Sequence, residues 1–526
     1  MAQYLTSALS GAVLLAAGWP AGAAEVTPAR LVNADKEPQN WLMNHRTYDG
    51  QRYSPLAQIN KDNVKGLRLA YSVSLGGSAG DEFNEATPLV EDGFLYTVDS
   101  WAVVYKIDVR SGEVGRIMWR MDPKEERQVA NRGVALWGNF VISIANYPAR
   151  IIATDKDSGK VVWETNTEFG QSGVSLRGAP LAIKDKILFG AAGGSSGIRD
   201  WLAAVDAATG KVAWRKFTVP APGEPGSETW KGNNNSWETG GGAVWVTGTY
   251  DPGSGQTIWG TGNPVPEYDP TVRPGDNLFT NSAISWDPDS GKMNWYFQYT
   301  PNDAWDFDEV GTHILIDSVV DGQPRKLITH SARNGFLYTM DRNNGQIIVA
   351  KPYMDNVNWT RGVDQKTGKP LDYDPNKDVQ IYAGGRQSGP GRTAQAALPD
   401  TPRRQQFLAV LLQPEDQADL HSSSRRLRDR RGQSRAANQG QALDRRFRRY
   451  HPASRKQPYR RRSDHRRDQE KRAPALPERQ RDAGDRRWGR LHRPARRHRG
   501  GVRRHHTRSI MEGQCGHGLF RPADDL

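Results

Sequence analysis

The chain is poor in cysteine, in long apolar runs and in helical periodicity. Its 526 residues include one cysteine, Cys515, so no intramolecular disulfide can form and cysteine usage says nothing about the compartment. The apolar run from Ala8 to Gly18 has about 11 residues, too few to span a membrane. Residues 60–350 show no sustained helical period. These absences argue against a disulfide-stapled scaffold, a membrane-spanning segment in this run and a helical fold.

The short apolar run is followed by a processing pattern. Ala21-Gly22-Ala23-Ala24 has the small-x-small form of a signal-peptidase site. We therefore predict a signal peptide over residues 1–24 and export to the periplasm. No Lys or Arg precedes the run, which points to a misplaced start codon or a weak signal. An ordinary buried N-terminal helix is the alternative.

Most of the chain lacks a net positive charge, although the net charge of the whole is +13. Residues 397–526 hold 34 Lys and Arg against 15 Asp and Glu, whereas residues 1–396 hold 38 against 44. Tryptophan is divided the opposite way, since 16 of the 17 lie before residue 397. We therefore expect residues 25–396 to fold and the Arg-rich tail, residues 397–526, to be disordered.

A short repeat recurs along the folded part. An acidic residue opens a turn, a glycine follows, and an aromatic residue comes at a fixed offset, as in Asp155 to Trp163. Further copies are Asp108 to Trp119, Asp206 to Trp214, Asp287 to Trp295 and a degenerate one at Asp341 to Val349. Asp and Gly suit a hairpin turn, and β-branched residues with Trp suit a packed strand. The spacing of roughly 50 residues is that of a four-stranded propeller blade, with a β-sandwich as the alternative.

Six ordered stretches carry a family resemblance: Asn131 to Ala135, Gly240 to Trp245, Gly260 to Asn263, Gly275 to Leu278, Ala304 to Asp306 and Ala332 to Phe336. Because these stretches follow one another in the family's order, the chain resembles the quinoprotein alcohol dehydrogenases. This is the methanol/ethanol dehydrogenase family that binds pyrroloquinoline quinone (PQQ). The likeness covers about residues 35–396. It implies an all-β, eight-bladed β-propeller, of which residues 25–396 would supply about five blades.

The resemblance assigns a metal site and a catalytic base. Asn263 offers an amide oxygen and Asp306 a carboxylate, both suited to calcium or a similar hard ion, and Asp306 is also the expected base. Asp308 would add a third oxygen and would point the same way as Asp306 if the segment were extended. An extra Asp there often accompanies a lanthanide in this family. A loop-capping role is the alternative for Asp308.

The resemblance also assigns residues to the quinone. Arg333 would hydrogen-bond the quinone oxygens and stabilise developing negative charge, so it is the second expected catalytic residue. Trp245 would form the floor beneath the flat cofactor. Glu85 and Arg132 stand at positions that contact the cofactor, and Arg177 replaces a threonine that usually faces it. Arg177 would then meet a cofactor carboxylate.

Two departures from the family pattern mark a divergent branch. Glu126 and Arg127 stand where many members have adjacent cysteines. Ser195 stands where a glutamate normally completes the metal site, and a hydroxyl is a poorer ligand for a hard cation. Asp308 could compensate for the lost charge. The substrate need not be a simple short alcohol.

The tail has the composition of a shifted reading frame in a G+C-rich gene. Moving one nucleotide forward turns Met511 and Glu512 into a tryptophan codon, and suitable codons through Leu526 then restore family-like sequence. The same shift over Arg403–Ser422 does so as well. We therefore predict a frameshift between Gln395 and Arg403, as a sequencing error or a broken gene. A basic tail that binds nucleic acid is the alternative.

Together these patterns predict a periplasmic oxidoreductase that oxidises a small alcohol to an aldehyde or ketone with PQQ and calcium or a lanthanide. Electrons would pass to a c-type cytochrome, in an electron-transport chain that could be membrane-associated. A homodimer is compatible, and no nucleic-acid partner is expected. The chain as written is expected to be inactive, because an unclosed propeller exposes a sheet edge and half its site. A non-catalytic propeller scaffold for protein binding is the alternative; Ser195 favours it, whereas Asn263, Asp306 and Arg333 argue against it.

Overall fold

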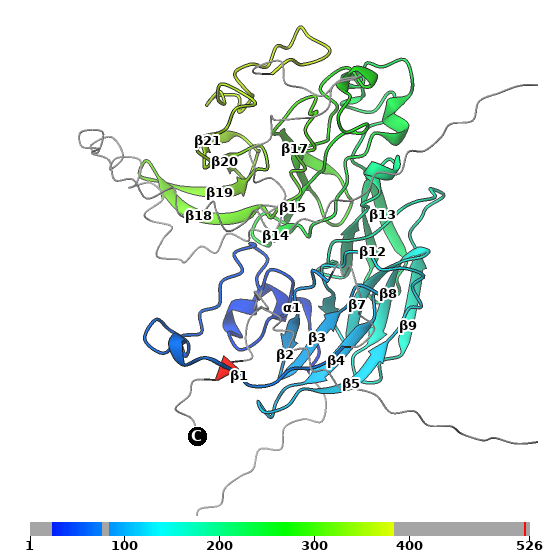
Figure 1. Cartoon of the computed structure of the whole chain (residues 1–526), viewed down its shortest axis with the longest axis vertical. Helices are drawn as coiled ribbons and strands as arrows, with labels where there is room; N and C mark the ends of the chain where they lie inside the picture. Colours follow the sequence, from blue (N-terminus) through cyan, green and yellow to red (C-terminus); the bar gives the residue numbers. More distant parts are fainter. Residues whose placement is uncertain (1–23, 76–83, 383–519, 522–526) are drawn as a thin grey trace, which may run out of the picture. The chain divides into compact units, whose positions relative to one another are not determined.

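The computed structural model describes residues 24–75, 84–382 and 520–521 (Figure 1). The chain divides into two units, residues 1–427 with 516–526 and residues 428–515, and the second unit lies outside the described residues. The predicted signal peptide lies outside them except for Ala24, and so does the predicted tail except for residues 520–521. The predicted domain boundaries and the frameshift therefore stay predictions.

Five four-stranded antiparallel sheets make up the described part, and in each the strands pair in sequence order. Figure 1 colours them from blue to yellow-green along the chain. Their strands are β2 (Leu89–Glu91), β3 (Phe94–Val98), β4 (Val104–Asp108) and β5 (Arg116–Met121); β6 (Ala135–Trp137), β7 (Phe140–Asn146), β8 (Ala149–Asp155) and β9 (Val161–Asn166); β10 (Leu181–Ile183), β11 (Lys186–Gly190), β12 (Trp201–Asp206) and β13 (Val212–Phe217); β14 (Thr249–Asp251), β15 (Gln256–Gly260), β16 (Ser282–Trp286) and β17 (Met293–Gln298); β18 (Ile314–Val320), β19 (Gln323–Ser331), β20 (Phe336–Asp341) and β21 (Ile347–Pro352).

Helical structure is short in the described residues. There is one α-helix, α1 (Pro28–Val32), and the 3-10 turns are η1 (Ala34–Lys36), η2 (Val64–Gly66), η3 (Gly194–Ser196), η4 (Ser227–Thr229), η5 (Ser236–Thr239) and η6 (Pro270–Val272). A further strand pair joins β1 (Arg68–Leu69) to β22 (Phe520–Arg521). Sequential four-stranded meanders are propeller blades, so the prediction of an all-β propeller with five blades is confirmed.

The acidic turns connect the third strand of each blade to the fourth, as predicted. In the second blade Gly159 N–H donates to Asp155 O at 2.9 Å, and Asp155 Oδ1 accepts the Ser158 N–H at 2.7 Å. Gly159 has φ +70°, a backbone conformation that a side chain disfavours. The third and fourth blades repeat this geometry around Asp206 and Asp287.

The tryptophans of the repeat join one blade to the next rather than only filling their own strand. The indole N–H groups donate to carbonyls in the acidic turn of the following blade, from Trp119 to Lys156, Trp163 to Ala207, Trp214 to Pro288 and Trp295 to Arg342. The turn glycines leave room for these rings, since a Cβ on Gly291 would lie 2.7 Å from Trp214. The fixed offset from turn to Trp therefore sets the contact between blades.

A sixth acidic turn follows the fifth blade and was missed in the sequence. Asp364 to Lys369 makes the same bonds, with Gly368 N–H donating to Asp364 O at 2.8 Å and Gly368 at φ +70°. It has no tryptophan at the usual offset. The turn chemistry of the repeat thus extends past β21.

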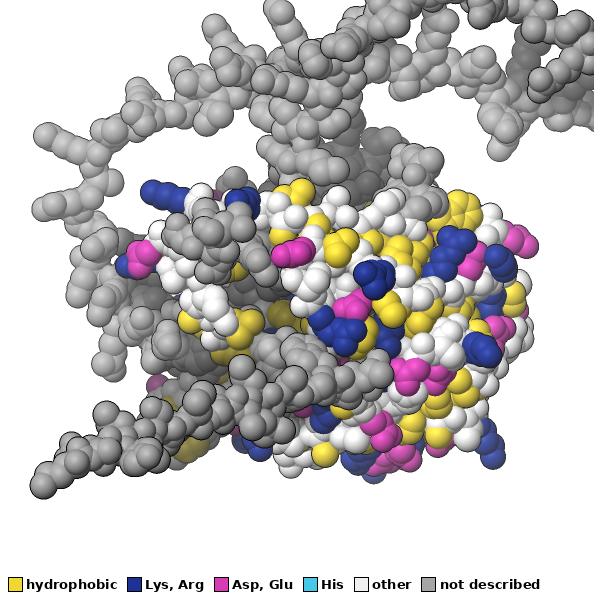
Figure 2. All heavy atoms as spheres, turned by 90° about the horizontal axis from the view of Figure 1, so that it is seen from below, with side chains coloured by type: hydrophobic (Ala, Val, Ile, Leu, Met, Phe, Trp, Pro, Cys, Tyr) yellow, Lys and Arg dark blue, Asp and Glu magenta, His cyan; other side chains and the backbone are white. Residues whose placement is uncertain are grey.

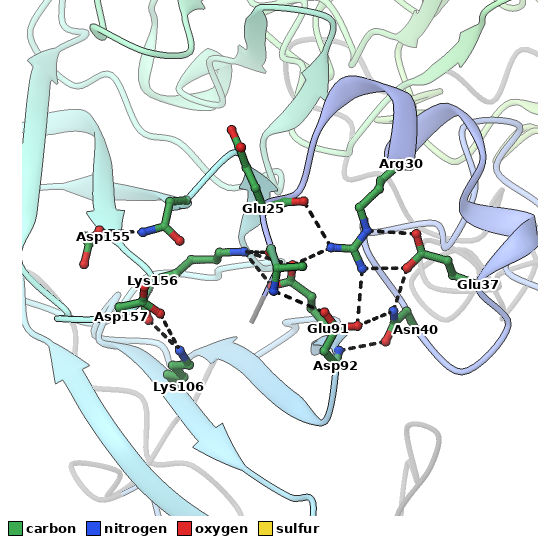
Figure 3. A network of polar contacts seen from close by, with 12 residues as sticks. Glu25, Arg30, Glu37, Asn40, Glu91, Asp92, Lys106, Asp155, Lys156 and Asp157 are labelled. Carbon is green, nitrogen blue, oxygen red and sulfur yellow. Dashed lines mark hydrogen bonds and ion pairs between the residues drawn. The ribbon is translucent and has the colours of Figure 1, made fainter. Parts of the chain in front are cut away.

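A buried charge network ties the N-terminal segment to the first two blades (Figure 3). Lys156, in the turn after β8, and Glu91, at the end of β2, have fully buried side chains 2.8 Å apart. Arg30 of α1 lies 2.9 Å from Glu91 and 2.7 Å from Glu37. Lys156 also donates to Ala24 O at 2.7 Å. Because both charges of the central pair are paired, their burial is tolerated.

The largest apolar core runs from α1 through the first four blades and includes Leu31, Tyr96, Ile152, Trp201 and Ile284. On the face in Figure 2, basic and acidic side chains alternate with apolar ones over the described part. No helix among the described residues is long and apolar enough to cross a membrane.

Candidate active site

The loop between β17 and β18 carries two candidate carboxylates, and Asp303 shapes it. Buried Asp303 accepts the backbone N–H groups of Trp305 and Phe307, both at 3.0 Å. Asp306 has φ +66°, a left-handed conformation that costs energy for a residue with a side chain. The segment is therefore not extended at Asp306, so the condition under which Asp308 would point the same way is not met. Strain of this kind tends to be kept at functional positions.

The two carboxylates nevertheless meet the same guanidinium. Arg333, just after β19, lies 3.1 Å from Asp308 Oδ2 and 3.9 Å from Asp306 Oδ2. Asn263, just after β15, donates its backbone N–H to Asp308 Oδ1 at 2.9 Å. Gly262 makes this approach possible, because a Cβ there would lie 2.4 Å from Asp308 Oδ1. Four of the predicted site residues thus form one cluster.

The cluster holds more negative charge than Arg333 offsets. Burial and the neighbouring Asp308 raise the pKa of Asp306 to about 8, although Arg333 lowers it. Burial also raises the pKa of Asp308, against the opposing effect of Arg333. A further positive charge would favour the ionised form of both carboxylates.

Glu309 fixes the backbone of Arg333 and was missed in the sequence. Its buried Oε2 accepts the Arg333 N–H at 2.9 Å and lies 3.0 Å from His330 Nε2. His330 in turn stacks on His313, with ring centroids 4.1 Å apart. His330 follows Glu309 by 21 residues, so no local pattern in the sequence indicates this support.

The predicted quinone-contacting residues form a second cluster. Arg132 makes an ion pair with Glu85 at 2.6 Å, and its guanidinium lies 4.5 Å from the ring centroid of Trp245. Arg132 N–H donates to Arg177 O at 3.1 Å, which brings a second arginine beside it. Burial lowers the pKa of Arg132 to about 10, and the charge of Asp308 opposes that shift. The two clusters therefore lie within electrostatic reach of each other.

Ser195 belongs to neither cluster, and like Arg177 it is exposed. It lies in η3 and its hydroxyl donates to Glu267 Oε1 at 2.5 Å. The charge of Glu267 acts on both Asp306 and Asp308, so this pair stands beside the carboxylate cluster. Glu267 was not identified in the sequence, since nothing local relates it to Ser195.

The donor set fits a hard cation in its chemistry. Asn263, Asp306 and Asp308 offer amide and carboxylate oxygens, and fully buried Asp200 has an Oδ2 atom without a hydrogen-bond partner. As the side chains stand, no three His, Cys, Asp or Glu groups in the described ranges lie close enough to hold an ion by themselves. An ion would therefore need the Asn263 amide or a shift of the carboxylates. Two surface hollows, of about 380 and 340 Å³, are lined by residues in and next to β4 and β5. They share no residue with this site.

A family model, curated relatives and solved structures all indicate the same protein family. Residues 41–352 match the PQQ family described as glucose/ethanol/alcohol dehydrogenase, beta-propeller domain. The quinohemoprotein alcohol dehydrogenase ADH-IIG of Pseudomonas putida is 38% identical over 400 residues, covering 70% of this chain and 54% of that protein. The quinohemoprotein alcohol dehydrogenase of Comamonas testosteroni is 39% identical over 398 residues, covering 70% and 55%. The solved structure of a europium-containing methanol dehydrogenase has a TM-score of 0.61 at 32% identity, covering 67% of this chain and 63% of that one.

The chain spans about half the length of the two curated relatives. The matched region contains both clusters, from Glu85 to Arg333. The chain belongs to the PQQ-dependent glucose/ethanol/alcohol dehydrogenase family of β-propellers.

Proposed function

We propose that the two clusters form a PQQ- and cation-dependent site that oxidises an alcohol to an aldehyde or ketone. The observation that carries this proposal is the meeting of Asp306, Asp308, Arg333 and Asn263 in one charge-imbalanced cluster beside Arg132 and Trp245. A scaffold for protein binding has no need for buried carboxylates that repel each other. The family membership supports the same conclusion.

Bound PQQ would supply the two-electron acceptor, and a bound cation would supply a Lewis acid at its carbonyl. Asp306 accepts the proton of the alcohol hydroxyl on a carboxylate oxygen, so it must be ionised first. Arg333 donates N–H groups to oxygens that gain negative charge. Trp245 offers a flat apolar surface for stacking, while Arg132 and Arg177 bring positive charge for carboxylates of the cofactor.

The cation would be held by Asn263, Asp306 and Asp308, with Ser195 at the position predicted to complete the site. Calcium and lanthanides both suit such oxygen donors. The likeness to a europium-containing methanol dehydrogenase supports a lanthanide as the alternative to calcium. The extra carboxylate of Asp308 favours an ion of higher charge.

We place this activity in the periplasm on the signal-like pattern at residues 8–24. A c-type cytochrome is the proposed electron acceptor, and the quinohemoprotein names of two relatives support a haem partner. Association with a membrane electron-transport chain and a homodimer remain part of the proposal.

We also propose that the chain as written does not turn over alcohol, because the predicted frameshift replaces the sequence after residue 396. The first check is to resequence the codons from Thr393 to Arg404. The protein as written and the protein with the restored frame are then assayed with PQQ, a panel of primary and secondary alcohols, an artificial electron acceptor, and calcium or lanthanum. Turnover by the restored protein alone supports the proposal. Absence of PQQ-dependent turnover in the restored protein with either ion contradicts it.

A further inference from the structure

Asp200 is a fully buried carboxylate that the proposed chemistry has not used. It lies just before β12, and its Oδ1 accepts the Gly193 N–H at 2.9 Å. Its Oδ2 atom has no hydrogen-bond partner. Among the described residues the charged group that acts on it is another carboxylate, Asp308. A buried carboxylate left this way is costly unless a cation or a proton neutralises it.

The backbone around Asp200 connects it to the carboxylate cluster. Asp200 N–H donates to Gly241 O at 3.1 Å, and Gly242 N–H donates to Asn263 O at 3.1 Å. Asn263 N–H reaches Asp308 Oδ1. Asp200, Asn263 and Asp308 are therefore carried on adjoining backbone segments that hydrogen bonds hold together.

The space at Oδ2 is kept by a glycine. A Cβ on Gly194 would lie 2.7 Å from Asp200 Oδ2 and 3.1 Å from the Cα of Gly241. The next residue, Ser195, turns its hydroxyl to Glu267 at the exposed rim. Position 195 thus gives the cluster no carboxylate, while buried Asp200 lies close enough to feel the charge of Asp308.

We propose that Asp200 supplies the carboxylate ligand that completes the cation site, in place of a ligand at position 195. This inference rests on the proposed function, because it concerns the same ion. Small movements of the Asp200 and Asp308 side chains toward a shared ion would neutralise both. Ser195 with Glu267 then forms the rim of the site rather than part of its ligand set.

The test is a terbium titration of the full chain, followed by luminescence sensitised by tryptophan. The variants are Asp200→Asn, Asp308→Asn and Asp206→Asn, the last removing a carboxylate from the far end of the same strand. We expect Asp200→Asn to weaken terbium binding by about tenfold or more, as loss of a site-supporting group does in other metal sites. Asp308→Asn should weaken it as well, and Asp206→Asn should match the wild type.

Thermal unfolding distinguishes a ligand from a structural carboxyl. Without a cation, Asp200→Asn should unfold at the wild-type temperature or above it, because its amide oxygen still accepts the Gly193 N–H. With terbium, the wild type should gain a rise in unfolding temperature that the variant lacks. If Asp200→Asn does not fold, Gly194→Ala gives the same test, since its methyl group would displace Oδ2.

The outcomes separate this inference from the proposed function. Terbium affinity that falls in Asp308→Asn and is unchanged in Asp200→Asn overturns the role of Asp200 and leaves the proposed site standing. A lower unfolding temperature without a cation, at unchanged affinity, means that Asp200 is a structural carboxyl only. No saturable binding by the wild type, or binding unchanged in every variant, overturns both proposals.

Discussion

At the scale of single residues, the charge balance of the Asp306–Asp308 pair decides what the site can do. Both carboxylates have raised pKa values from burial, and Arg333 compensates only in part. An ion is expected to bind the ionised carboxylates, so binding must release the proton that Asp306 holds below pH 8. The same imbalance that disfavours ionised Asp306 would favour the binding of a cation, as the proposed function requires.

Cation affinity should therefore depend on pH. The pKa of Asp306 is about 8, so below pH 8 each bound ion displaces a proton from it. Affinity should rise by about tenfold per pH unit up to pH 8 and then level off. Calcium or terbium titrations at pH 6, 7, 8 and 9 measure the slope, and Asp306→Asn should flatten it. An affinity independent of pH in the wild type would rule out the displaced proton.

At the scale of elements, the turn and its tryptophan act across neighbouring blades. Trp214 in β13 is buried, and its indole donates to Pro288 O at 2.9 Å in the next turn. Trp214→Ala should lower the free energy of unfolding by about 3–5 kcal/mol, since it leaves a cavity between two blades. Trp214→Phe keeps most of the ring and should lose about 1 kcal/mol with the hydrogen bond.

Urea unfolding of the two variants measures both values, and Gly291→Ala provides the complementary change on the opposite side of the contact. The added methyl group would press on Trp214 and would occupy a residue at φ +67°. We expect it to cost more than about 1 kcal/mol. Losses below about 0.5 kcal/mol in all three variants would show that the contact does not hold the blades together.

Local patterns in the sequence predicted the elements better than the site. The acidic turns are visible because Asp155, Gly159 and their equivalents act within a few residues of each other, although the copy at Asp364 was missed. The docking of each tryptophan on the next blade needs a partner in a different repeat, 37 residues away for Trp119 and 44 for Trp163. Asp308 would have pointed the same way as Asp306 only in an extended segment, whereas the N–H groups of Trp305 and Phe307 donate to Asp303 and Asp306 takes a left-handed conformation.

The predicted site residues were named from family motifs, and the structure brings all of them except Ser195 into the two clusters. Their roles stay predictions. Glu309, Glu267 and Asp200 were missed because each meets its partner through the fold, over 21, 72 and 7 residues. Asp200 is only 7 residues from its partner Gly193, but an Asp before a buried strand has no distinctive sequence pattern, so the sequence did not indicate it.

At the scale of the whole molecule, charges far apart in the sequence hold the N-terminal segment on the blades. Lys156 and Glu91 are 65 residues apart and fully buried. Lys156→Met should cost about 3–5 kcal/mol, because buried Glu91 would lose its closest cationic partner. The double variant Lys156→Met/Glu91→Leu should recover much of this loss. A double-mutant cycle measured by urea unfolding gives the coupling energy between Lys156 and Glu91. If the two single losses simply add in the double variant, the pair does not stabilise the fold as a unit.

The central claim is that the described blades carry a PQQ site that depends on a cation. Titration of the protein with the restored frame with PQQ, followed by quenching of tryptophan fluorescence, tests it most directly, with and without calcium or lanthanum. We predict saturable binding of PQQ only when the cation is present, and loss of that binding in Asp308→Asn. Binding of PQQ to neither form, or equal binding without a cation and in Asp308→Asn, would contradict the claim.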